Sequence, residues 1–65
     1  MRGRLARNLR RKREALGLSQ EAFAELVHIH RTYVSDLERA RRNPTITVVE
    51  KMAAALGCTP GSLLD

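Results

Sequence analysis

The stretch LSQEAFAELVHIHRTYVSDL, which runs from Leu18 to Leu37, decides the fold of this chain. Apolar residues recur at the spacing of one helix face within residues 20–27, and Ser19 stands before them as a candidate N-cap. The apolar pattern is interrupted over 28–30 and then resumes within 31–39. This pattern predicts two short helices joined by a tight turn, with polar residues along one side of the second helix.

Two short helices around a tight turn are typical of a helix-turn-helix, in which the second helix enters the major groove of DNA. The guanidinium of Arg31 matches the O6 and N7 acceptors of guanine, with a phosphate contact as the alternative. The carboxylate of Asp36 is able to accept from a cytosine amino group, but we favour an ion pair with Arg39. The candidate base-reading residues are Arg31, Thr32, Ser35 and Asp36.

The whole chain predicts five helices and no strand. A T-x-x-E capping box formed by Thr47 and Glu50 is expected to begin the fourth helix, and Thr59 followed by Pro60 to begin the fifth. The fold class is therefore all-α, a compact bundle in which residues 1–65 form a single helix-turn-helix domain. The expected helices cover about residues 4–15, 20–27, 31–39 and 47–56, and a short segment after Pro60.

The formal net charge of +5 in 65 residues indicates a polyanionic partner. The segment 2–13 contains basic residues and no acidic residue, and a second basic cluster follows the expected recognition helix at 39–42. Some of the first arginines are expected to form a solvated face or to steer DNA from a distance. These are Arg7, Arg10 and Arg11.

The sequence has no signature of an enzyme or a metal site. A single cysteine, Cys58, excludes an internal disulfide, and its position after Leu56-Gly57 favours a buried thiol. There is no glycine-rich phosphate loop, and His28 and His30 lie in a turn without a third ligand. We therefore expect no catalytic residue, metal or cofactor. With no membrane-length apolar run and no signal peptide, we expect a cytoplasmic, nucleoid-associated protein of a prokaryote or a phage.

Several short pieces occur in order along the chain: LRxxR over 9–13, LGLSQE over 16–21, RTYVSxLER over 31–39, NPTI over 43–46 and ALG over 55–57. In this order and spacing the chain resembles the Cro/cI-type (XRE-like) helix-turn-helix family, whose fold is a compact all-α bundle of the lambda-repressor type. Members are mostly sequence-specific transcriptional regulators that bind as dimers. The RTYVSxLER run is also similar to restriction-modification controller proteins, which are small stand-alone members of the family.

The resemblance implies roles for further residues. Gln20 matches the family glutamine that binds a DNA phosphate, and Arg13 matches the arginine that forms a partly buried bridge with the glutamate at Glu38. From its place on the helix, Tyr33 is expected to pack its ring at the edge of the core and to offer its hydroxyl to a phosphate. The residues expected at the DNA backbone are Gln20, Tyr33, Arg39, Arg41, Arg42 and Asn43.

The chain departs from the family pattern around the expected recognition helix. His28 occupies a turn position that usually holds glycine, because the turn tends to need a positive φ. His30 stands where the family usually has a Ser or Thr N-cap. Ala40 replaces the usual glycine after the helix, so we expect that exit to be continued or reshaped.

The expected partner is double-stranded DNA carrying a palindromic operator, bound by a homodimer. The candidate dimer surface is formed by Val48, Leu63 and Leu64. One alternative is an antitoxin that binds a toxin partner as well as its own operator. Another is a nucleoid protein that binds any duplex without sequence preference.

Overall fold

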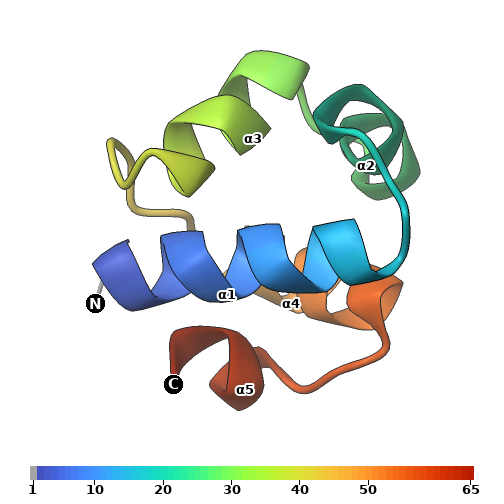
Figure 1. The fold of residues 1–65 in the computed structure, drawn as a ribbon. Helices are drawn as coiled ribbons and strands as arrows, with labels where there is room; N and C mark the ends of the chain where they lie inside the picture. Colours follow the sequence, from blue (N-terminus) through green and yellow to red (C-terminus); the bar gives the residue numbers. More distant parts are fainter. Residues whose placement is uncertain (1) are drawn as a thin grey trace.

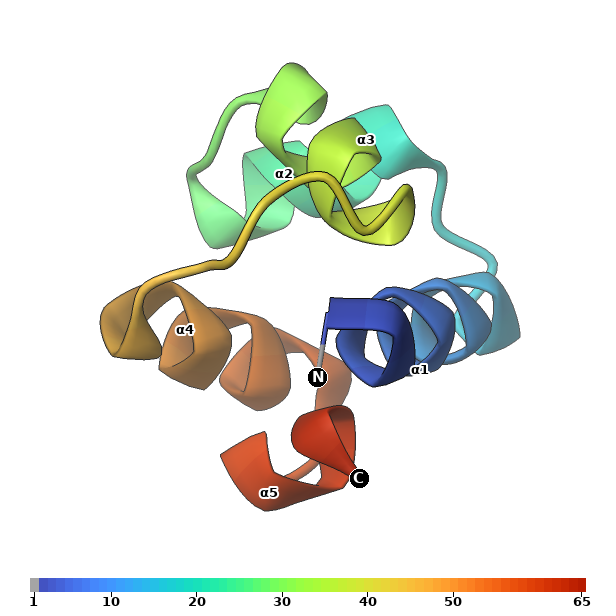
Figure 2. The same ribbon diagram turned by 90° about the vertical axis from the view of Figure 1, so that its left-hand side faces the viewer.

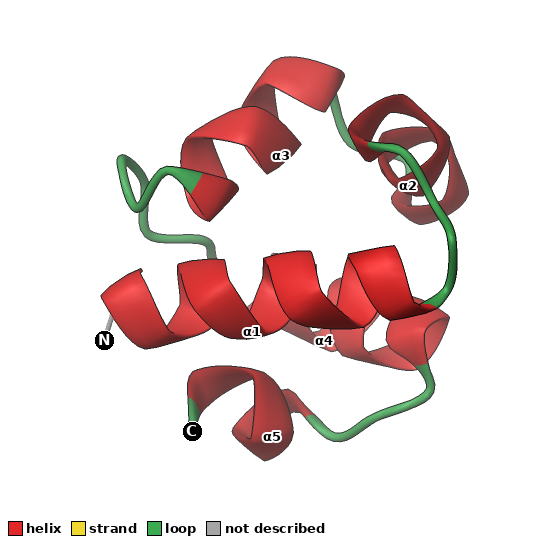
Figure 3. Ribbon diagram, viewed as in Figure 1, coloured by secondary structure: helices red, strands yellow, loops and turns green. Residues whose placement is uncertain are grey.

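Five helices make up most of residues 2–65, the part of the chain that this computed structural model describes. They contain no strand between them, so the all-α prediction is confirmed within those residues (Figure 1, Figure 3). The helices are α1 (Arg2–Ala15), α2 (Gln20–Val27), α3 (Arg31–Glu38), α4 (Ile46–Leu56) and α5 (Pro60–Leu64).

Hydroxyl side chains cap the N-termini of three helices. The Ser19 hydroxyl accepts a hydrogen bond from the backbone N–H of Ala22 at 3.0 Å, as its position before α2 predicted. Thr59 caps α5 in the same way, and Pro60 takes the first helical position. These caps satisfy backbone donors that have no partner inside the helix.

The predicted capping box at the start of α4 is wrong. Thr45, not Thr47, is the N-cap: its backbone is extended and its hydroxyl accepts from the backbone N–H of Val48 at 3.2 Å. The helix therefore begins at Ile46, and Thr47 lies inside its first turn. Either threonine precedes an apolar helical pattern, and the extended backbone at Thr45 decides between them.

Left-handed backbone ends several helices, and two of the residues concerned are not glycine. Gly17 follows α1 and Gly57 follows α4, and their φ values are 72° and 70°. His28 closes α2 with φ 62°, and its backbone N–H donates to the Glu25 carbonyl at 3.2 Å. Ala40 has φ 58°, so α3 ends at Glu38 and the chain turns sharply after it.

The core lies where α1 crosses beneath α2 and α3, with α4 behind it and α5 closing the lower side (Figure 1, Figure 2). Phe23 and Met52 are fully buried, and Cys58 is half-buried at the edge of the core. Leu63 is also fully buried, so its assignment to a dimer surface is wrong: α5 turns this side chain inward against α1 and α4. Leu16 lies just after the end of α1 at Ala15 and is 53% exposed.

Replacing Ala40 by glycine should stabilise the fold. A non-glycine residue with positive φ costs of order 1–3 kcal/mol, while glycine adds about 0.5–1 kcal/mol of unfolded-state entropy. We expect Ala40→Gly to raise the free energy of unfolding by about 1 kcal/mol in urea titrations. The matched control is Ala54→Gly on the exposed side of α4, which should lower it by about 1 kcal/mol. A loss of stability for Ala40→Gly would show that its backbone is not strained.

Candidate nucleic-acid interface

Helix α3 lies at the edge of the bundle (Figure 1). It buries one side and presents a polar side outward. Val34 and Leu37 are buried in the core. On the other side Arg31 and Thr32 are exposed and Ser35 is half-buried. A helix placed in this way has its N-terminal side chains free to contact a surface outside the molecule, which is the geometry that a major-groove helix requires.

A histidine caps the N-terminus of α3. The Nδ1 atom of His30 accepts a hydrogen bond from the backbone N–H of Thr32 at 3.1 Å, with His30 in an extended conformation. The imidazole thus takes the place of the serine or threonine hydroxyl expected at this position. The first turn of the candidate recognition helix is therefore fixed by a side chain from the preceding turn.

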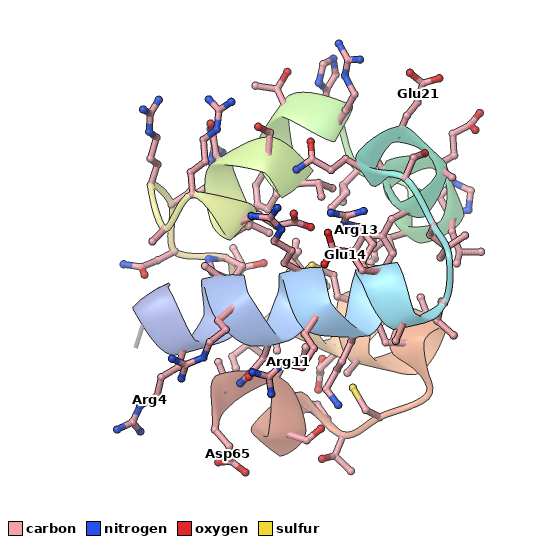
Figure 4. All side chains as sticks on the ribbon, in the orientation of Figure 1. Arg4, Arg11, Arg13, Glu14, Glu21 and Asp65 are labelled. Atoms are coloured by element: carbon pink, nitrogen blue, oxygen red, sulfur yellow. The ribbon has the colours of Figure 1, made fainter. Side chains whose placement is uncertain are left out.

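Arg31 lies beside an acidic residue that the sequence analysis did not single out. Its guanidinium is 3.6 Å from the carboxylate of Glu21 in the first turn of α2, and both side chains are exposed. Figure 4 shows Glu21 pointing outward from α2. Exposed ion pairs contribute little stability, so Arg31 is free to exchange Glu21 for another acceptor. The only sequence signal for this pair was the position of Glu21 in the first turn of α2. An acidic residue there is already explained by its favourable interaction with the helix dipole, so it does not by itself indicate a partner.

The C-terminal side of α3 is tied to the following loop through Arg42. Its guanidinium lies 3.7 Å from the carboxylate of Asp36 and 4.6 Å from the ring centre of half-buried Tyr33. Asp36 therefore pairs with Arg42 and not with Arg39, which the interpretation favoured from the sequence had named. The reshaped exit at Ala40 brings the loop back along the helix, since the Arg41 backbone N–H donates to the Asp36 carbonyl at 2.9 Å.

A buried ion pair joins α1 to α3. Arg13 meets Glu38 through two contacts, Nε to Oε2 at 2.6 Å and Nη2 to Oε1 at 3.0 Å. Their side chains are only 9% and 4% exposed. The remaining guanidinium nitrogen donates to the Leu18 carbonyl at 2.6 Å, so Arg13 also holds the segment that leads into α2. Figure 4 shows the Arg13 side chain between α1 and the helices above it. The structure thus brings together the two residues predicted to form the bridge.

Gln20, at the first position of α2, belongs to the same cluster. Its side-chain amide donates to Glu38 Oε1 at 3.1 Å. That contact uses one amide hydrogen and leaves the other hydrogen and the oxygen free. Gln20, which was expected to contact a DNA phosphate, is therefore held in place by its hydrogen bond to the buried Glu38.

The charge on Arg13 is reinforced by its surroundings. The hydrogen bond to Glu38 raises the pKa of Arg13, burial works in the opposite direction, and the negative charges of Glu38 and Glu14 raise it further. A cation with a raised pKa stabilises the fold at every pH below its ordinary range and loses that effect only as the pH rises through the folded value. The contribution of Arg13 is therefore present throughout the neutral range.

The remaining expected backbone contacts, Arg39, Arg41 and Asn43, are exposed around the end of α3. Val48 and Leu64, expected at a dimer surface, are half-buried and pack against the core. Within residues 2–65 no group of three or more His, Cys, Asp or Glu side chains is arranged to hold a metal ion. No helix in that range has the length and apolar character needed to cross a bilayer.

Residues 9–63 match the family described as "Helix-turn-helix". The chain is 48% identical to Control protein C.BamHI of Bacillus amyloliquefaciens over 48 residues, which cover 74% of this chain and 59% of that protein. The crystal structure of a hypothetical transcription factor from Neisseria superposes with a TM-score of 0.94 at 47% identity, covering 98% of this chain and 74% of that one. The restriction-modification controller protein C.AhdI from Aeromonas hydrophila superposes with a TM-score of 0.90 at 39% identity, covering 95% of this chain and 94% of that one. Relative to the full-length sequences of these proteins, this chain spans only 59% of C.BamHI and 60% of the Neisseria protein.

Removing the buried carboxylate should destabilise the fold strongly. Glu38→Ala leaves the Arg13 guanidinium buried without its partner, and we expect a loss of about 3 kcal/mol in the free energy of unfolding measured with urea. The control is Glu14→Ala, which removes a carboxylate that also faces Arg13, at 4.0 Å, but is 56% exposed. It should change stability by less than about 1 kcal/mol. If the two substitutions lowered the free energy of unfolding equally, the buried pair would contribute no more to stability than the exposed carboxylate does.

Proposed function

This chain belongs to the Cro/cI-type (XRE-like) helix-turn-helix family, and we propose that it is a transcriptional regulator that binds a specific double-stranded DNA sequence. The observation that carries the proposal is the outward polar side of α3, fixed at its N-terminus by His30 and joined to α1 by the Glu38 bridge. A rigid helix with exposed arginine and hydroxyl side chains suits insertion into the major groove.

In this proposal the side chains of the first half of α3 read the bases. Arg31 leaves Glu21 and donates both ends of its guanidinium to a guanine. Thr32 and Ser35 offer hydroxyls to base edges or to a nearby phosphate. Asp36 has a smaller part in reading bases than its position suggested, because Arg42 already occupies its carboxylate.

The DNA backbone is held on both sides of α3. Gln20 and the free N–H groups at the start of α2 bind one phosphate, since a helix N-terminus favours an anion. Arg39, Arg41 and Asn43 are exposed near the other end of α3 and bind phosphates there. Such contacts set the register and the affinity, while the bases set the preference.

The biological role we propose is that of a controller or repressor acting on a nearby promoter. The support comes from similarity to proteins named as restriction-modification controllers and transcription factors. DNA as the partner implies a cytoplasmic protein that works at the nucleoid. We propose no catalytic activity, and no feature within residues 2–65 favours the antitoxin alternative.

Arg31 gives the direct test of base reading. Arg31→Ala should cost about 1–3 kcal/mol at the cognate operator and relax the preference at one base position per half-site. The measurement is a competition between the operator and single-base variants in fluorescence anisotropy. An unrelated duplex of equal length serves as the control and should be affected much less. A uniform loss on both duplexes would make Arg31 a phosphate contact and would contradict the proposed reading.

We further propose that the binding form is a two-fold dimer that uses the outer side of α4. Ile46 is 67% exposed at the first position of that helix, so it is a suitable apolar contact. Ile46→Glu should remain folded and sediment as a monomer at concentrations where the wild type is a dimer. Leu16→Glu is the control, because Leu16 is 53% exposed at the end of α1 and should leave the dimer intact. Wild-type protein that sediments as a monomer even with the operator would overturn the dimer.

A further inference from the structure

An open groove of about 530 Å³ runs between α1 and the end of α3, outside the helix-turn-helix. Helix α1 contributes Arg7 and Arg10 to it, and the end of α3 contributes Arg39. Glu38 lies at its inner edge. Its long side chains are therefore mainly arginines, brought together from two parts of the chain that are distant in sequence.

The groove carries a net positive charge that the protein does not cancel. Glu38 is neutralised by its buried pair with Arg13. Arg10 meets Glu14 at 3.4 Å, but both side chains are more than half exposed, so that pair is weak. Among the described residues, neither Arg7 nor Arg39 forms an ion pair. Arginines that lack acidic partners and face one another across a groove favour an anion between them.

The floor of the groove is made of small residues. Ala6 is 6% exposed, and Ala40 turns the chain away with its left-handed backbone. Neither residue projects a long side chain into the space between the arginines. A phosphate group with its deoxyribose is therefore able to approach the guanidinium groups from outside.

The groove lies beside the surface that we propose to bind DNA. Gln20, at the start of α2, donates to Glu38, and Glu38 is also part of the groove lining. Donor groups thus follow one another from the N-terminus of α2, past the buried pair, to Arg10 and Arg7 on α1. The start of α2 and the groove therefore have Glu38 as a common neighbour.

We propose that this groove binds the sugar–phosphate backbone of DNA that flanks each half-site, with Arg7 and Arg10 as phosphate ligands in addition to Arg39. The inference rests on the proposed DNA-binding function and extends the contact surface beyond the helix-turn-helix. It replaces the expectation that Arg7 and Arg10 only form a solvated face or steer DNA from a distance. These contacts supply affinity and contribute nothing to base preference.

The test compares arginines of one helix. Arg7→Ala and Arg10→Ala should each weaken operator binding by roughly three- to eightfold at 0.1 M salt and reduce the log–log salt slope by about 0.9 per bound protomer. Arg4→Ala is the matched control, because Figure 4 shows Arg4 pointing away from α3. It should change neither quantity beyond error. Thermal melts of all variants should coincide, since these arginines are exposed.

Two further measurements change the acidic residue of the groove or the length of the duplex. Glu14→Gln removes the exposed carboxylate that lines the groove and should tighten binding to every duplex severalfold. Trimming the duplex to the operator itself should weaken wild-type binding at least as much as the double substitution Arg7→Ala with Arg10→Ala does, and should weaken that double variant much less.

The proposal is overturned if Arg7→Ala and Arg10→Ala behave like Arg4→Ala, or if trimming affects wild type and the double variant equally. If either result is found but the wild-type protein still prefers its operator to unrelated DNA, only the groove proposal fails and the proposed function is retained. Wild-type protein that fails to distinguish its operator from unrelated DNA contradicts the proposed function itself, whatever the arginine variants do.

Discussion

The buried pair between Arg13 and Glu38 is the interaction on which the rest of the structure depends. It joins α1 to α3, and the third nitrogen of the same guanidinium holds the Leu18 carbonyl before α2. Gln20 adds the start of α2 to the cluster through Glu38. One arginine thus fixes the two helices of the helix-turn-helix relative to each other and to α1. In a small domain with a limited apolar core, such a pair helps to fix the relative orientation of the helices. Pairing buried charges is not in itself a large source of stability.

Helix α3 is bounded at both ends by less favourable backbone. His28 precedes its cap with φ 62°, and Ala40 follows it with φ 58°. Neither residue is glycine, so each turn stores some strain that the packing of Val34 and Leu37 has to offset. Strained backbone beside an exposed polar helix is common where a binding surface, and not the core, sets the geometry.

Local signals predicted most of the fold, and long-range contacts were harder to predict. Ser19 and the apolar spacing of α2 were sufficient for that helix, because capping and amphipathicity act within a few residues. Leu63 was placed on the wrong side, because the burial of an apolar residue in a short terminal helix depends on how the helix docks. The partners of Asp36 and Arg31 were missed for the same reason: Arg42 reaches Asp36 only after the turn at Ala40. The Arg13–Glu38 bridge was foreseen from the family resemblance and not from the residue spacing.

Selection of bound sequences from a random duplex library tests most directly whether this surface reads DNA as a symmetric pair. A two-fold dimer of helix-turn-helix units predicts enrichment of a palindrome whose half-site centres are about 34 Å apart, or a multiple of that distance along one face of the duplex. Enrichment of no sequence, with similar binding to every duplex, would contradict sequence-specific recognition by α3. Enrichment of a single unrepeated half-site would contradict the dimer and leave base reading by α3 intact.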